Sequence, residues 1–316
     1  NTVMCGIIGC ISFEGNKNSY ARKNVMEQAF VIGSLRGDHS TGLFGVSVDE
    51  KETPTKVDFY KKDLAGYDFI QLSKTRKFLT DIDKYKYIIG HHRQATHGTI
   101  STENAHPFMH EHITLVHNGS LTHLSNLTGE FNKFDVDSEV LTYAIATKGH
   151  KNILPKIKGA AAIVWNDVKE NTLYLYRNKE RPLFFAKIKG EETSFIASEM
   201  WMLKGLIWRN GLEVEQVYEV GENQLVEFTD KALPNKVETI ELEKEVITRY
   251  TNYGKNTYHE GNYKNKRKMR LPIVAKDVFE TLGLIDGQKI RFIIESIALP
   301  DTVSKHGKAV GYLTSS

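Results

Sequence analysis

Eight short apolar runs, rich in β-branched residues, are the feature that most constrains the fold of this chain. Runs of this length and composition are typical of buried strands. Four longer segments between them carry the apolar period of a helix. Because strands and helices alternate only in part, the pattern favours an α+β layered fold over a regular βαβ array. The strand-like runs are residues 5–12, 42–48, 87–91, 113–117, 160–165, 173–176, 195–197 and 224–228, and the helix-like segments are 19–35, 68–80, 137–147 and 198–208.

Composition narrows the class of protein. Of the 316 residues, 40% are hydrophobic and 26% are charged, which excludes a disordered, collagen-like or membrane-spanning chain. A net charge of +3 is too balanced for nucleic-acid or membrane-surface binding by the whole chain. Cys5 and Cys10 cannot form a disulfide framework for a chain of this size, and the first residues lack the pattern of a secretory signal. We therefore expect a cytoplasmic protein.

The apolar periodicity ends near residue 235, which predicts a main domain followed by an appendage. Between Tyr250 and Arg270 the chain carries four tyrosines and then a basic run from Lys264 to Arg270. Residues 271–295 loosely resemble the swapped-hairpin half of AbrB-like domains, which dimerise and often bind DNA. A solvated linker before a docking or oligomerisation module is the simpler interpretation, so nucleic-acid binding is not expected. The expected divisions are a leader at 1–4, a main domain at 5–235, a linker at 236–270 and a small module at 271–316.

Eight of the twelve histidines lie between His91 and His123. One interpretation is a metal site, because some of them have the spacing of ligands and carboxylates lie nearby. Against it, the HExxH motif is missing, and a strand at 113–117 would send alternate side chains to opposite faces. We expect no metal, and no cofactor either, because phosphate-loop and dinucleotide-binding motifs are missing too. The residues of such a metal site would be His106, His110, Glu111 and Asp137.

Cys5 is a candidate nucleophile. Its thiol lies at the start of an apolar run and is followed by Gly6, which lets a substrate approach closely. If the residues up to Met4 were removed, Cys5 would carry a free α-amino group with an ordinary pKa of about 7.7 to 8. That amine is suited to act as general base for the neighbouring thiol, as in N-terminal nucleophile enzymes. A buried structural cysteine is the alternative that this segment alone leaves open.

Five motifs, in order along the chain, resemble those of the class II glutamine amidotransferases. In that family a glutaminase domain precedes domains such as those of glucosamine-6-phosphate synthase and amidophosphoribosyltransferase. The resemblance implies the four-layer αββα fold of N-terminal nucleophile hydrolases, and an enzyme that hydrolyses the side-chain amide of L-glutamine to glutamate and ammonia. The motifs are Cys5-Gly6-Ile7-Ile8-Gly9, Arg36-Gly37 with Ser40 and Gly42, Gly90-His91-His92-Arg93-Gln94-Ala95-Thr96-His97-Gly98 with Asn104-Ala105-His106-Pro107, Val116-His117-Asn118-Gly119, and Asp137-Ser138-Glu139-Val140.

The resemblance implies a role for each matched residue. Cys5 would attack the amide carbon and form a thioester. Asn118 and the backbone N–H of Gly119 would donate hydrogen bonds to the developing oxyanion. Arg93 would hold the α-carboxylate and Asp137 the α-ammonium, which matches the zwitterion of a free amino acid. Supporting positions around the glutamine pocket are Thr96, His97 and Arg36.

Two positions depart from the motifs of many relatives. Gln94 stands where they have a tryptophan after the arginine, and His39 where they have an acid after the Arg-Gly pair. Because the tryptophan would close the pocket and wall an ammonia path, its absence argues against tight channelling. Residues 1–4 precede Cys5 as a propeptide or a leftover of expression. We expect the extended form to lack glutaminase activity.

The part of the chain that follows the motifs is short. The roughly 80 residues left there are too few for the synthase or transferase of the relatives, since such a domain needs a large core of its own. We therefore expect the ammonia to be used by a separate partner enzyme. Two other functions stay open: another N-terminal nucleophile amidase acting on peptide or γ-glutamyl amides, and a catalytically silent glutamine-binding or interaction protein. Arg93 together with Asp137 argues for free glutamine.

Overall fold

The computed structural model describes residues 5–13, 18–47, 56–95 and 98–243, and two short strands nearer the C-terminus. Contacts divide the chain into two units, Asn1–Ile247 and Thr248–Ser316. In the second unit the described part consists of β14 (Ile297–Ala298) and β15 (Val310–Gly311), which pair antiparallel. All other described elements belong to the first unit.

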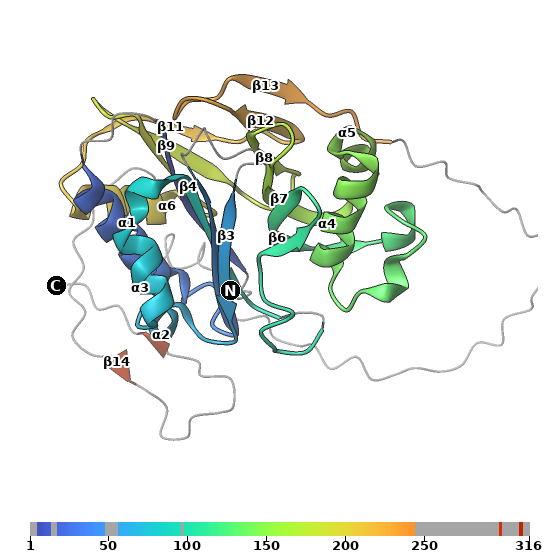
Figure 1. The fold of residues 1–316 in the computed structure, drawn as a ribbon, viewed down its shortest axis with the longest axis horizontal. Helices are drawn as coiled ribbons and strands as arrows, with labels where there is room; N and C mark the ends of the chain where they lie inside the picture. Colours follow the sequence, from blue (N-terminus) through green and yellow to red (C-terminus); the bar gives the residue numbers. More distant parts are fainter. Residues whose placement is uncertain are drawn as a thin grey trace, which may run out of the picture. The chain divides into compact units, whose positions relative to one another are not determined.

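Two sheets built from antiparallel strand pairs stack face to face in the first unit (Figure 1). In the described residues, one sheet has the order β11-β9-β10-β1-β4-β2-β3 and the other the order β13-β12-β8-β7-β6-β5. The first sheet comprises β1 (Gly6–Ser12), β2 (Ser40–Ser47), β3 (Val57–Lys62), β4 (Tyr85–Arg93), β9 (Phe184–Ile188), β10 (Thr193–Ala197) and β11 (Val214–Glu219). The second comprises β5 (Phe108–His110), β6 (Ile113–Thr122), β7 (Lys158–Asp167), β8 (Thr172–Arg177), β12 (Gln224–Phe228) and β13 (Lys236–Thr239).

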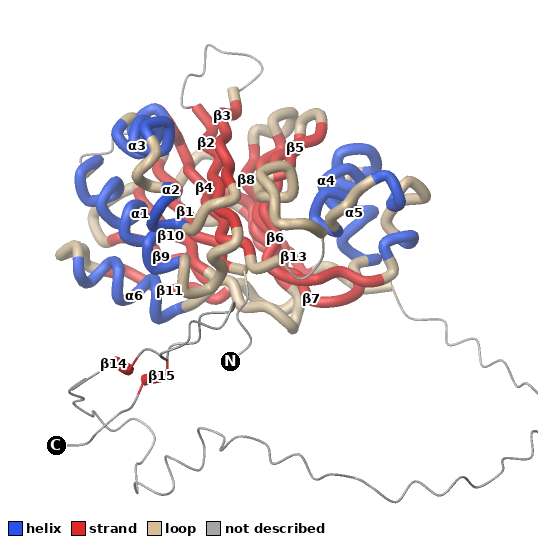
Figure 2. Tube along the Cα trace, turned by 90° about the horizontal axis from the view of Figure 1, so that it is seen from below, coloured by secondary structure: helices blue, strands red, loops and turns tan. Residues whose placement is uncertain are grey.

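Helices cover the outer face of each sheet, which makes four layers (Figure 2). Alternate side chains of β1 show the arrangement: Ile8 packs among the helices of the first sheet, whereas Ile7 packs between the two sheets. A third cluster joins the second sheet to its own helices. The predicted four-layer αββα fold is thus confirmed. The helices are α1 (Ser19–Gly33), α2 (Gly66–Phe69), α3 (Ser73–Thr80) and α6 (Met200–Arg209) on the first sheet, and α4 (Asp137–Lys148) and α5 (His150–Ile153) on the second.

Local sequence explains where several elements begin and where the predicted ones differ. The helix α1 begins after Asn18, whose side chain accepts a hydrogen bond from the Ala21 N–H at 3.1 Å. The single helix predicted at 68–80 is wrong, because Leu72 has an extended backbone and separates α2 from α3. The strand β3 escaped prediction because its polar sequence, VDFYKK, lacks a continuous apolar run. Short 3₁₀ helices lie at Ile82–Lys84, Leu124–Asn126, Phe131–Lys133 and Leu154–Lys156.

The described structure extends somewhat beyond the expected domain boundary at residue 235. The strand β13 pairs with β12 and so adds an edge to the second sheet. The leader at 1–4, the basic run at 264–270 and the segment 271–295 lie outside the described residues. Among the residues that are described, none forms a helix long and apolar enough to cross a membrane.

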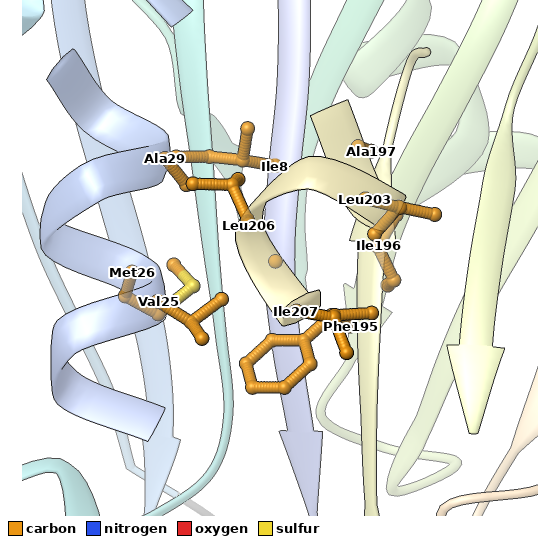
Figure 3. A pocket seen from close by; sticks show the side chains of 11 residues that line it. Ile8, Val25, Met26, Ala29, Phe195, Ile196, Ala197, Leu203, Leu206 and Ile207 are labelled. Atoms are coloured by element: carbon orange, nitrogen blue, oxygen red, sulfur yellow. The ribbon is translucent and has the colours of Figure 1, made fainter. Parts of the chain in front are cut away.

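A narrow apolar gap lies between α1, α6 and the sheet beneath them (Figure 3). Val25 and Met26 of α1 line one side, and Leu206 and Ile207 of α6 line another, above Phe195 of β10. Because the lining is almost entirely apolar, this gap belongs to the packing of the core and offers no chemistry of its own.

Candidate active site

Cys5 lies directly before β1, a central strand of the first sheet. The half-buried thiol contacts the backbone of Gln94 through two atoms. Its Sγ accepts a hydrogen bond from the Gln94 N–H at 3.2 Å and faces the Gln94 carbonyl oxygen at 3.5 Å. Burial raises the pKa of the Cys5 thiol, and the Asp137 carboxylate raises it too. The Gln94 N–H and the charge of Arg93 act in the opposite direction. A thiol with a raised pKa needs a base before it can attack.

The pairing of β1 with β4 brings Arg93 to the thiol. Gly6 lies opposite His92 in this pair, so the next residues of β4 pass beside Cys5. The Arg93 side chain is buried, and its Nη1 donates to the Thr99 carbonyl oxygen at 3.0 Å. Burial lowers the pKa of Arg93, while the charges of Cys5 and Asp137 oppose that shift. A buried guanidinium is suited to hold an anionic group in a fixed orientation.

The loop after α1 holds the backbone of Cys5. Arg36 donates to the Cys5 carbonyl oxygen through Nε at 3.3 Å and Nη2 at 3.2 Å, and its Nη1 pairs with the Glu199 carboxylate. Gly37 lets this loop approach β4, because a Cβ there would lie 2.6 Å from the carbonyl carbon of Arg93. Arg36 therefore fixes the residue that carries the thiol.

Asn118 and Gly119 lie in β6, between β7 and the edge strand β5 of the second sheet. The Asn118 side chain is buried, and its Nδ2 donates to Ser198 Oγ at 3.3 Å. The same oxygen accepts from the Ile7 N–H at 2.9 Å, so Ser198 links the two sheets. A Cβ on Gly119 would lie 1.9 Å from the Ala160 carbonyl oxygen, which leaves room for glycine alone.

Asp137 is the first residue of α4. One carboxylate oxygen accepts from the Leu121 N–H at 2.7 Å, and the other from the Ser138 N–H at 2.8 Å. The N-terminus of a helix favours negative charge there. These contacts fix the carboxylate at the pocket, where its remaining lone pairs are suited to bind a cation.

A pocket lies beside the thiol, and its lining residues include Cys5, Arg93, Gly119 and Asp137. Of the other predicted site residues, Asn118 and Arg36 do not line it and contact Ser198 and the Cys5 carbonyl instead. Thr96 and His97 lie outside the described residues. The complete lining is Cys5, Arg93, Gln94, His106, His117, Gly119, Val136, Asp137 and Ser138.

Three buried histidines surround this pocket or its wall. His117 donates from Nε2 to the Ala160 carbonyl oxygen at 3.2 Å, so its Nδ1 accepts from the Ser138 hydroxyl at 2.9 Å. His91 contacts the His117 carbonyl oxygen at 2.9 Å, and its ring packs at a tilt against that of His106. The ring nitrogens of His106 have no hydrogen-bond partner among the described residues. Burial lowers the pKa of all three, so they are neutral at pH 7. In the described part of the chain, no group of three His, Cys, Asp or Glu is arranged to hold a metal.

Some residues of the site were missed by sequence reasoning. Ser198 and Glu199 were expected only as the start of a helix, yet they bind Asn118 and Arg36. Ser138 appeared only as part of a motif, without a contact to His117. The one sequence signal for Ser198 and Glu199 was their place as a polar pair between an apolar strand and a helix.

Comparison with known proteins identifies the family of this chain. The profile described as "Glutamine amidotransferase domain" matches residues 78–259, which is more than half of the chain. A glutamine--fructose-6-phosphate aminotransferase [isomerizing] from Helicobacter pylori is 26% identical over 280 residues, covering 83% of this chain and 41% of that protein. The protein of the same name from Listeria monocytogenes is 32% identical over 263 residues, covering 78% of this chain and 38% of that protein. The chain thus spans about two fifths of the length of these relatives.

A solved structure shares the fold. It is the glutamine phosphoribosylpyrophosphate amidotransferase from B. subtilis complexed with ADP and GMP, with a TM-score of 0.56 and 21% identity. The match covers 76% of this chain and 50% of that one. The order of motifs, the four layers and the matching profile lead to one conclusion: the chain belongs to the class II glutamine amidotransferase family.

Proposed function

We propose that this chain hydrolyses the side-chain amide of free L-glutamine to glutamate and ammonia through a thioester on Cys5. The observation that carries the proposal is the convergence of a thiol, a buried guanidinium and a carboxylate on one pocket. The opposite charges of Arg93 and Asp137 complement the α-carboxylate and α-ammonium of a free amino acid. The amide of the substrate would then face Cys5.

The chemistry needs a base close to the thiol, because burial raises the pKa of Cys5. When Cys5 is the first residue, its α-amine takes the thiol proton as Sγ bonds to the amide carbon. The C–N bond then breaks, and the amine returns the proton to the departing ammonia. Water attacks the thioester with the same amine as base, and the C–S bond breaks to release glutamate and restore the thiol.

The developing oxyanion would be held by Asn118 and Gly119 of β6. The Asn118 amide has two N–H bonds, and one is used on Ser198 Oγ. The other would donate to the oxyanion together with the Gly119 N–H. Losing one such donor costs on the order of 2.7 to 4 kcal/mol of transition-state stabilisation. Arg36 would hold Cys5 in place, and Thr96 and His97 remain predicted supporting residues.

The released ammonia would serve an acceptor enzyme. The relatives named above are aminotransferases that use glutamine, and this chain matches only about two fifths of each. We propose that the acceptor reaction takes place on a synthase or transferase partner.

The test compares protein that begins at Cys5 with protein that keeps residues 1–4. We expect the first to release glutamate from glutamine and the second to release none; equal release from both would overturn the α-amine mechanism. Cys5→Ser in the shorter protein is the control for the nucleophile. A mass increase at Cys5 after treatment with a glutamine analogue that carries a diazoketone checks the site directly.

A substrate panel separates the alternatives. Turnover of peptide-bound glutamine or γ-glutamyl amides at rates equal to free glutamine would indicate a different amidase. Binding of glutamine without turnover, with Cys5 unmodified, would indicate a silent binding protein.

A further inference from the structure

Two side chains outside the proposed glutamine clamps meet beside the thiol. His39 follows α1 in the loop that carries Arg36, and Gln94 follows β4. Gln94 Nε2 lies 3.3 Å from His39 Nε2, and the Ala95 N–H donates to His39 Nδ1 at 3.0 Å. These are the two positions at which the sequence departs from the motifs of many relatives. Both departures therefore belong to one contact.

The hydrogen bonds of this contact fix the state of the imidazole. Because Nδ1 accepts from Ala95, it carries no proton, so the proton of the neutral ring lies on Nε2. An Nε2–H needs an acceptor opposite it. Gln94 Oε1 is buried and has no hydrogen-bond partner among the described residues. Rotating the Gln94 amide by half a turn places that oxygen on His39 Nε2 and satisfies both groups.

The contact between His39 and Gln94 is adjacent to the Cys5 thiol. The backbone of Gln94 is the unit that donates to Cys5 Sγ at 3.2 Å and presents its carbonyl oxygen at 3.5 Å. His39 binds this segment three times, through Gln94, through the Ala95 N–H, and through its own N–H, which donates to the Arg93 carbonyl oxygen at 3.2 Å. The segment that contacts the thiol is thus held by His39, twice through its imidazole and once through its backbone.

We propose that His39 and Gln94 form a positioning pair that keeps the Gln94 N–H on the Cys5 sulfur and so sets the reactivity of the thiol. The proposal rests on the proposed function, in which Cys5 is the nucleophile. His39 touches neither thiol nor pocket, so it acts through the segment that it binds. A hydrogen bond to a thiolate stabilises it, and losing the order of that bond makes the thiolate harder to form.

Other charged groups lie near Cys5 and near His39. Arg93, Asp137 and Arg36 surround Cys5, the first two through their charges and the third through the carbonyl oxygen. Asp38 lies 3.9 Å from His39, and its side chain is 62% exposed to solvent. A test must therefore separate the effect of His39 from that of the neighbouring charge, which Asp38→Asn does.

The experiment measures the alkylation rate of Cys5 by iodoacetamide between pH 6 and pH 10, by intact mass, in full-length Cys10→Ala protein. Removing Cys10 leaves one thiol; Cys10 is buried within β1 and does not line the pocket beside Cys5. We expect His39→Ala and Gln94→Met each to slow alkylation at pH 7.5 roughly three- to tenfold and to move the midpoint to higher pH. Asp38→Asn should stay within about twofold of the parent.

The double variant of His39 and Gln94 tests whether the two side chains act through the same contact. The double variant should be no slower than the slower single variant, because either change removes the same contact. His39→Asn keeps an acceptor for the Ala95 N–H and should recover most of the rate. Parent-like alkylation of His39→Ala, or fold-changes that multiply in the double variant, would overturn the proposal. Circular dichroism checks the fold, and Gln94→Met alone remains informative if His39→Ala does not fold.

The readout does not require turnover of glutamine. If the variants show coupled loss of thiol reactivity while processed protein releases no glutamate, the positioning pair stands and the proposed function fails. If glutamate is released and alkylation is unchanged in the variants, the proposed function stands and the positioning pair fails. In active protein, the same variants should lower kcat with little change in KM, because the glutamine clamps are intact.

Discussion

The guanidinium of Arg36 and the carbonyl oxygen of Cys5 are joined by two hydrogen bonds, at 3.3 and 3.2 Å. Glu199 holds the guanidinium from the other side. In the processed form proposed above, Cys5 would have only one peptide neighbour to orient it, so the side chain that binds its carbonyl oxygen would determine where both the thiol and the amine point. The position of the Cys5 backbone is thus held by a residue that does not line the pocket.

We expect Arg36→Met to lower kcat for glutamine hydrolysis roughly 10- to 100-fold in protein that begins at Cys5, because small displacements of reacting groups are costly. Glu199→Gln should cause a smaller loss, since the two hydrogen bonds to Cys5 remain. The matched control is Arg76→Met, an exposed arginine of α3, which should leave the rate unchanged. Steady-state glutamate release measures all three; a parent-like kcat for Arg36→Met would contradict this role.

Gly119→Ala should destabilise the protein by about 3 kcal/mol, near the upper end of the cost of overpacking. The added Cβ would meet the Ala160 carbonyl oxygen at 1.9 Å and His117 Nε2 at 2.5 Å, and the backbone atom cannot yield without breaking the β6 and β7 pairing. Chemical denaturation measures the change.

Gly205→Ala provides the opposite control. That glycine lies inside α6, and a Cβ there meets no atom within 4 Å. We expect it to stabilise the protein by about 0.5 to 1 kcal/mol, because alanine is the better helix former. Equal effects of the two substitutions would show that local helix and strand preferences, and not the crowding at Gly119, decide the outcome.

Acid should destabilise this protein through its buried histidines. Burial lowers the pKa of His92 from 6.5 to about 4. The folded state therefore binds fewer protons than the unfolded state below pH 6.5, and stability present at pH 7 is lost as the pH falls towards 4. For His92 alone the loss between pH 7 and pH 5 is about 2 kcal/mol, and His91, His106 and His117 act in the same direction.

His92→Gln should reduce this pH dependence by about 2 kcal/mol. Glutamine keeps a donor for the Phe30 carbonyl oxygen, which His92 Nε2 contacts at 2.9 Å, but it does not titrate. The control is His123→Asn, at an exposed residue with a positive φ of 54°, a conformation that asparagine tolerates. Unfolding free energies at pH 7 and pH 5 supply the test; an unchanged difference in His92→Gln would refute this explanation.

Much of the fold was predictable because it depends on local patterns. Apolar runs predict most central strands. The ordered motifs predict one shared site for Cys5, Arg93, Gly119 and Asp137, which line one pocket in the structure. The contact of His39 with Gln94 was not predictable, since 55 residues separate them and only the pairing of β2 with β4 brings their segments together. Ser198 and Glu199 were missed for the same reason. Edge strands such as β3 escaped because half-exposed strands carry mixed polarity.

The apolar gap between α1 and α6 gives a stability prediction that is independent of the active site. Leu206 is 3% exposed and lines this gap, so Leu206→Ala enlarges a space that is already imperfectly filled. We expect a loss of about 3 kcal/mol, from the removed apolar contacts and from the added cavity. Trp208→Ala on the exposed face of the same helix, where the tryptophan is 82% exposed, should stay within about 0.5 kcal/mol. Urea unfolding compares the two; if both variants lose the same stability, helix α6 is not held by its contacts across the gap.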